Sequence, residues 1–169
     1  MCAKLRKTCL ALAACLLPLL ALADETLHKH FSDDELVELL EELGFRAVDK
    51  VEDRVLSLRI DGYVHYLYVY DDDDLQLYFG LTGYEISPLD INEWNRTRRL
   101  SRAYLDDEND PVIEADLLAN AGYTGKQLAE WIAVFDRSAR QFHDFVATTD
   151  QSRRGESTQL STAEAGELD

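Results

Sequence analysis

The sequence predicts an α+β fold, in which an antiparallel β-sheet is flanked by helices in the order α-β-β-β-β-α-β-β-α. Three stretches begin with Ser or Thr followed three residues later by Glu, Asp or Gln, a pattern typical of helix N-termini. Short runs rich in aromatic and β-branched residues lie between them, separated by turn residues, which indicates strands joined by tight turns. The last of the three stretches opens a long run with apolar residues at helical spacing.

The first 23 residues have the three-part pattern of a secretory signal peptide. The basic residues Lys4, Arg6 and Lys7 precede an apolar run from Leu10 to Leu22, and Ala21-Leu22-Ala23 is a typical cleavage site. The run is too short for a stable membrane span, and no other run approaches spanning length. We therefore expect an exported chain, periplasmic or secreted, that begins at Asp24 and spans no membrane.

The cysteines indicate a fold that is held together by packing alone. All three cysteines, Cys2, Cys9 and Cys15, lie in the leader, so the cleaved chain has none for disulfides. An alternative is a lipid anchor, because Leu12-Ala13-Ala14-Cys15 resembles a lipoprotein signal. We favour the cleaved soluble form, because the apolar run continues past Cys15, whereas such runs normally end near the cut.

The strong negative charge excludes some classes of partner. The 169 residues include 33 acidic and 17 basic side chains, for a net charge of −16. The leader holds three of the basic residues and no acidic one, so its removal leaves a net charge of −19. A surface this acidic repels nucleic acids and anionic membranes. We expect a protein partner or a homodimer, and no nucleic acid.

The first helix is predicted to follow a polar leader at residues 24–31. Ser32 and Glu35 form a capping box. Leu36, Leu39, Leu40 and Leu43 then recur at the spacing of one helix face. His28 and His30 lie close enough to chelate a metal, but a structural site needs ligands held by a fold, so no metal is expected.

Four strands should come next. The candidates are residues 46–51, 55–60, 63–70 and 75–81. Asp61-Gly62 is a strong signal for a two-residue hairpin turn. That turn predicts the pairs Ile60–Tyr63, Leu58–His65 and Leu56–Leu67, with His65 as a packed, hydrogen-bonded histidine. The four aspartates at 71–74 indicate a solvated turn, because they lack the Gly and the distal Glu of an EF-hand calcium loop.

A short, firmly capped helix after these strands should be the structural anchor of the domain. Its anchor residues are Ser87, Asp90, Ile91, Asn92, Trp94 and Asn95. Ser87 and Asp90 form a second capping box, and Ile91 and Trp94 share one helix face. Asn92 and Asn95 could form a binding site. We favour instead that they cap the helix end or bond the backbone of the next strand, which is the usual habit of Asn.

A second hairpin and a long helix complete the predicted fold. Strands at residues 99–105 and 112–118 should pair so that Arg102 and Tyr104 share a face with Glu114 and Asp116. Thr124 and Gln127 cap a helix whose apolar side should end near Val146. Residues 148–169 hold almost no large apolar side chains, so we predict a disordered tail there.

Strand parity places the candidate interaction surface on one face of the sheet. Its residues are Val64, Tyr66, Tyr68, Tyr70 and Tyr78, opposite the aliphatic side chains of the same strands. If the helices cover only the aliphatic face, these side chains stand on an open face, and tyrosine is enriched at protein interfaces. The alternative is that the tyrosines are ordinary strand residues and that the long helix covers them.

Several segments resemble the YbjN family. They are Asp90-Ile91-Asn92-Glu93-Trp94-Asn95, the Arg-rich strand running into Ala103-Tyr104-Leu105-Asp106, and Val112 to Leu117 before Gly122. The resemblance covers about Ser32 to Val146, so the domain is expected at residues 32–147. It implies an α+β fold similar to that of type III secretion chaperones. Members are described as sensory transduction regulators, and the resemblance brings no catalytic residues.

We therefore expect an exported, non-enzymatic, YbjN-like protein that serves as a protein-binding or regulatory module. No nucleophile elbow, zinc-protease motif or phosphate loop is present, so no catalytic residue and no cofactor are expected. The alternative is a periplasmic chaperone-like protein that holds an exported client. Secretion chaperones act in the cytosol, and the leader argues against that location here.

Overall fold

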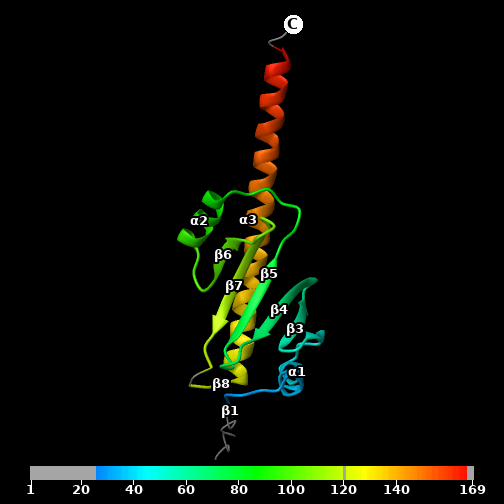
Figure 1. Cartoon of the computed structure of the whole chain (residues 1–169), viewed down its shortest axis with the longest axis vertical. Helices are drawn as coiled ribbons and strands as arrows, with labels where there is room; N and C mark the ends of the chain where they lie inside the picture. Colours follow the sequence, from blue (N-terminus) through cyan, green and yellow to red (C-terminus); the bar gives the residue numbers. More distant parts are fainter. Residues whose placement is uncertain (1–25, 120, 167–169) are drawn as a thin grey trace, which may run out of the picture.

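The computed structural model describes residues 26–119 and 121–166, with side chains as far as residue 155. The elements, in order, are β1 (Leu27–His28), α1 (Asp33–Glu42), β2 (Val48–Glu52), β3 (Val55–Ile60), β4 (Tyr63–Val69), β5 (Leu75–Gly80), α2 (Pro88–Thr97), β6 (Arg102–Leu105), β7 (Pro111–Leu117), β8 (Tyr123–Thr124) and α3 (Gly125–Gly166) (Figure 1). Apart from the two-residue strands β1 and β8, this is the predicted α+β order. The predicted signal peptide at 1–23 lies outside the described residues.

A six-stranded antiparallel sheet, in the order β2-β3-β4-β5-β7-β6, forms the centre of the molecule. Asp61 and Gly62 both have positive φ, 48° and 91°, as the predicted hairpin turn requires. The register is the predicted one: Ile60 pairs with Tyr63, Leu58 with His65, and Leu56 with Leu67. In the second hairpin, Arg102 pairs with Glu114, which confirms the parity argument there.

The three helices lie on one side of the sheet. Helix α1 contacts β2 and β3, α3 contacts β5 and β7, and α2 contacts β6. Figure 1 shows α3 running along the back of the sheet and projecting beyond it. The fully buried side chains between these layers include Leu36, Leu40, Leu56, Leu58, Leu67, Leu77, Ile113, Leu128, Phe135 and Phe142. Each contributes about 1.5–3 kcal/mol through removal from water, and their burial is the main force that holds the helices to the sheet.

The predicted helix starts are confirmed. The Ser32 side chain accepts the backbone N–H of Glu35, whose carboxylate accepts the backbone N–H of Ser32. Ser87 and Asp90 make the same pair of bonds at α2. Thr124 and Gln127 repeat them at α3, at 3.2 and 2.9 Å. These side chains satisfy backbone N–H groups that have no partner within a helix.

The polar leader predicted at residues 24–31 contains a short strand, β1, that pairs with β8 just before α3. Leu27 pairs with Thr124, and His28 pairs with Tyr123. The ring of Phe31 stacks between those of His28 and Tyr123, with centroid distances of 5.0 and 5.7 Å. A two-residue strand is too short to show any periodicity, so the sequence does not reveal this pairing.

The strand predicted at residues 99–105 begins only at Arg102. Leu100 has a φ of 67°, a left-handed conformation that strands do not contain. The chain therefore joins β7 late, and the beginning of the predicted strand is an irregular segment.

The predicted end of the last helix near Val146 is wrong, because α3 continues to Gly166. The disordered tail predicted at residues 148–169 is therefore wrong as far as residue 166, and residues 167–169 lie outside the described residues. As far as Arg154, polar contacts hold this part of α3 to the rest of the fold. The Asp150 carboxylate accepts the backbone N–H of Glu85 at 2.9 Å and the guanidinium of Arg154 at 2.8 Å. Arg153 reaches Ser87 and Asp90 at the N-terminus of α2. These polar anchors are not visible in the spacing of apolar side chains, on which the predicted helix end depended.

Candidate functional site

The predicted tyrosine face is the side of the sheet opposite the helices. Tyr66 lies directly opposite Tyr78 across β4 and β5. The side chains of Tyr66 and Tyr70 are 36% and 47% exposed, whereas Val64, Tyr68 and Tyr78 are half-buried. Figure 1 shows none of the described helices in front of β4 and β5, so α3 does not cover this face.

The tyrosine rings contact one another across the two strands. The Tyr78 centroid lies 6.4 Å from that of Tyr66 and 6.1 Å from that of Tyr68, the second contact being edge-on. A Cβ at Gly80 would lie 3.0 Å from the Tyr78 hydroxyl, so the missing side chain leaves room for this ring. Burial raises the pKa of Tyr78 to about 12 and also raises the pKa of Tyr68. Tyrosine hydroxyls are already neutral at physiological pH, so these two remain neutral hydrogen-bond donors.

Polar groups border the tyrosine face at the end of β4. The Tyr70 hydroxyl donates to Gln76 Oε1 at 3.0 Å, and Gln76 Nε2 donates to Asp116 Oδ1 at 2.9 Å. On β6, which β7 separates from β5, Arg102 lies over the Tyr104 ring, 5.9 Å from its centroid. Aromatic surface with a polar border is the composition that protein interfaces favour.

His65 lies on the opposite, buried face, as predicted. Its Nε2 is 3.1 Å from Asp136 Oδ1, so it links β4 to α3 through the core. Burial lowers the pKa of His65. Within residues 26–119 and 121–166, no three His, Cys, Asp or Glu side chains are arranged to hold a metal ion.

Ile91 and Trp94 bury one face of the anchor helix α2 against α3. Trp94 is 1% exposed, and its ring centroid lies 5.1 Å from that of Phe142. Ile91 is buried on the same face. These contacts make α2 part of the core, as its spacing predicts.

Asn95 bonds the backbone of the next strand, which is the role that we favoured over a binding site. Its Nδ2 donates to the Ala103 carbonyl and its Oδ1 accepts the Ala103 N–H, both at 2.9 Å. These two bonds occupy the outer edge of β6. Asn92 is exposed on the same helix and takes no part in this contact.

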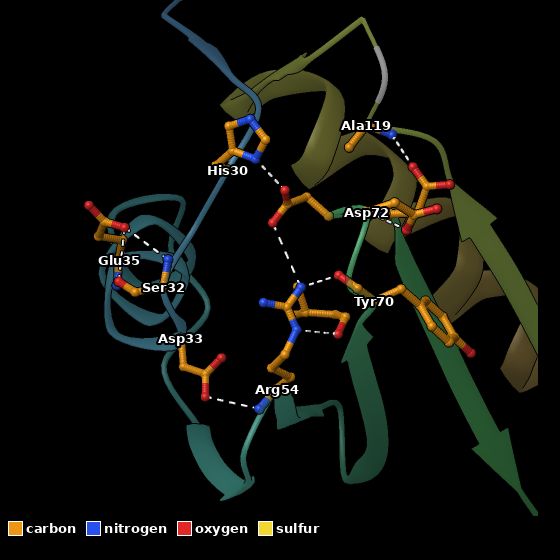
Figure 2. Close-up of polar contacts among 11 residues, drawn as sticks. His30, Ser32, Asp33, Glu35, Arg54, Tyr70, Asp72 and Ala119 are labelled. Carbon is orange, nitrogen blue, oxygen red and sulfur yellow. Dashed lines mark hydrogen bonds and ion pairs between the residues drawn. The ribbon is translucent and has the colours of Figure 1, made fainter.

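The turn of four aspartates is a polar junction of the fold, so the prediction of a solvated turn is wrong for Asp73 and Asp74. Asp73 pairs with His30 and Arg54, and Asp74 accepts the backbone N–H of Ala119 at 2.6 Å. Figure 2 shows Arg54 between Asp33 on one side and Tyr70 on the other. The Arg54 backbone N–H donates to Asp33 at 3.0 Å, and a hydrogen bond from Lys50 lowers the pKa of Asp33. Charge spacing alone does not reveal these partners.

A groove of about 630 Å³ at the outer edge of β7 was not predicted from the sequence. Its apolar lining includes Leu100, Leu118, Trp131, Val134 and Phe135. The groove forms beside the end of β7 that does not pair with β6, and next to Leu100, which has a left-handed backbone conformation. Neither feature produces a periodic pattern in the sequence.

Within the part of the chain that the structure describes, no helix combines the length and the apolar character that a membrane span requires.

Comparison with known proteins identifies a family and a fold. The family described as "YbjN: Putative bacterial sensory transduction regulator" matches residues 32–147. No curated protein matches the sequence. Among solved structures, the chain is similar to the Yersinia pestis type III secretion chaperone SycH, crystallised in complex with a stable fragment of YscM2. The two chains are 20% identical, with a TM-score of 0.50, over 63% of this chain and 94% of the chaperone. At this identity the likeness shows the fold alone.

Proposed function

The chain belongs to the YbjN family, and from that premise we propose that it is an exported, non-enzymatic regulatory module that binds a protein partner or a second copy of itself. The family and the chaperone-like fold are both of non-enzymatic kinds, and both support a protein-binding role. The proposed contact surface is the tyrosine face: Val64, Tyr66, Tyr68, Tyr70 and Tyr78.

The observation that carries this proposal is the one-sided cover of the sheet. All three described helices pack on the aliphatic face, and the tyrosine rings of β4 and β5 remain accessible on the other. Tyrosine presents a large apolar ring and a polar tip, so a partner gains apolar burial and a hydrogen bond from one side chain. The neutral hydroxyls of Tyr68 and Tyr78 suit that role.

The second candidate function is a chaperone-like protein that holds an exported client. Its support is the chaperone fold, because SycH was crystallised with a fragment of another protein. A client chaperone should suppress the aggregation of several unfolded proteins, whereas a regulator should capture one partner. Aggregation assays and a pull-down from the periplasmic fraction separate the two.

Export is supported by the leader pattern and by the confinement of all cysteines to it. The mature chain is expected to begin at Asp24. Intact-mass analysis of the protein from the periplasmic fraction tests this. A mass that corresponds to an acylated Cys15 would replace the cleaved form with a lipoprotein.

The tyrosine face is tested by replacing Tyr66 and Tyr68 together with Ser. The double variant should lose self-association in analytical ultracentrifugation, or lose its partner in the pull-down, and should still fold. The matched control is Leu89→Ser, which removes an apolar side chain 79% exposed on α2, away from this face. If the double variant unfolds, the tyrosines are core residues. If it folds and every association persists, the contact lies elsewhere.

A further inference from the structure

The strand β7 is longer than the strand that pairs with its outer edge. Pro111 to Glu114 pair with β6, whereas Ala115 to Leu117 pair only with β5. The cause is Leu100, whose φ of 67° keeps the preceding chain out of the sheet. No strand of the described residues therefore occupies the outer edge of β7 beyond Glu114.

The backbone of Asp116 points to that open edge. On the β5 side, the Leu81 N–H donates to the Pro111 carbonyl at 3.0 Å. In an antiparallel strand, consecutive residues direct their N–H and C=O groups to alternate sides. Ala115 and Leu117 therefore bond to β5, and Asp116 presents its N–H and C=O outward.

The adjacent edge of β6 is closed. Asn95 occupies both the N–H and the C=O of Ala103, at 2.9 Å each. A side chain that caps one edge is a usual protection against unwanted strand pairing. The edge at Asp116 has no such cap among the described residues and opens onto the groove.

The groove beside this edge has an apolar floor and acidic margins. Trp131, Val134 and Phe135 of α3 line it. Two leucines at its margin, Leu100 and Leu118, are 69% and 67% exposed. Its carboxylates are Glu114, Asp116 and Glu130, against the single guanidinium of Arg102, which pairs with Glu114. The surplus of negative charge favours a basic occupant.

We propose that this groove receives an extended segment of a partner protein, which adds as a strand to the open edge of β7. Its backbone would bond the N–H and C=O of Asp116. Apolar side chains at alternate positions would contact Trp131 and Val134, and a basic side chain would meet Asp116 or Glu130. The groove lies beside α3 rather than on the tyrosine face, although Asp116 borders that face through Gln76. The groove takes a different form of ligand, a single extended segment.

The test uses the chain from Asp24 and a blocked heptapeptide in which valine alternates with threonine, with lysine at both ends. In an NMR titration, the backbone amide signals of Asp116 and Leu118 and the indole signal of Trp131 should shift and saturate. Val134→Lys should weaken binding at least tenfold, because it places a like charge in the groove. The control Ala133→Lys adds the same charge at the preceding residue of α3, which is exposed. This variant should bind the peptide as wild type does.

The charge requirement has its own control. The same peptide with glutamate in place of lysine should bind at least tenfold more weakly. If Val134→Lys fails to fold, Leu118→Ser replaces it, and this loss of an exposed apolar side chain should weaken binding by at least threefold.

Three results would overturn the proposal: no shift at Asp116 or Trp131, equal binding by the groove variants and wild type, or occupation of the groove by a second copy in the absence of peptide. The double replacement of Tyr66 and Tyr68 with Ser should leave peptide binding unchanged. The experiments thus distinguish a failure of the proposed peptide binding in the groove from a failure of the proposed protein binding through the tyrosine face.

Discussion

Trp94 is the side chain that ties the anchor helix to the long helix. Its ring meets Phe142 and Phe145 of α3, at centroid distances of 5.1 and 5.5 Å. The cap residue Ser87 lies at the start of the same helix and is half-buried. Removal of the Trp94 ring should therefore lower the free energy of unfolding much more than removal of the Ser87 cap.

We expect Trp94→Ala to lower the free energy of unfolding by ~3–5 kcal/mol, the usual cost of removing a large buried aromatic. Ser87→Ala should cost only ~1 kcal/mol, as for a lost cap. Denaturant melts of both variants check the order. If the Trp94→Ala variant melts like wild type, packing of α2 in the core does not stabilise the domain.

His65 should make stability depend on pH. Burial lowers its pKa in the folded state, so the unfolded chain binds the proton more readily. Its stabilising contribution is complete above the unfolded pKa of about 6.5 and is lost as pH falls below that value. The loss cannot exceed about 1.4 kcal/mol per pH unit for one proton.

The expected result is a shallower loss of stability between pH 6.5 and 5 in His65→Asn than in wild type. Denaturant melts at pH 5, 6 and 7.5 give both slopes. The charged neighbours Asp136 and Arg140 are present in both proteins, so the difference isolates the imidazole. Equal slopes would show that His65 binds its proton in the folded state as readily as in the unfolded state.

At the level of elements, α2 protects the sheet edge through Asn95. Replacing it with Ala removes two hydrogen bonds to Ala103, and each such bond contributes about 0.5–1.5 kcal/mol. We expect Asn95→Ala to cost about 1–3 kcal/mol in a denaturant melt. Asn92→Ala, an exposed position on the same helix, should stay within about 0.5 kcal/mol of wild type. Similar costs for both variants would argue against an edge cap.

The polar contacts that α3 makes beyond residue 147, the predicted end of the domain, should stabilise the fold. A chain that ends at residue 147 loses Asp150, Arg153 and Arg154 and, with them, the bonds to the segment before α2. A chain that ends at residue 155 keeps them. Thermal melts should place the shorter chain clearly below the full chain and the longer one close to it. If both truncations melt together, these contacts do not stabilise the domain.

The sequence predicted what depends on periodicity and on local turn chemistry. The Asp61-Gly62 turn and period-two alternation determined the register of β3 and β4, and hence which side chains share the tyrosine face. Capping boxes located all three helix starts. The predictions were wrong where long-range polar contacts extend an element, as Asp150 does for α3. They were also wrong where a single backbone conformation sets the start of a strand, as at Leu100 before β6.

The whole molecule is asymmetric. One side of the sheet supports all the described helices, and the other carries partly exposed tyrosines. The strong net charge of −16 favours basic partners over nucleic acids. This asymmetry is what the proposed protein-binding role depends on.

Photo-cross-linking in the living cell tests that role. A photoreactive amino acid replaces Tyr66 in one chain and, in the matched control, Glu41, which is exposed on α1 at the helix-covered side. The proposed function predicts a single cross-linked protein species from position 66, either one partner or a dimer, and none from position 41. Equal cross-linking from both positions, or none from position 66, would contradict binding through the tyrosine face.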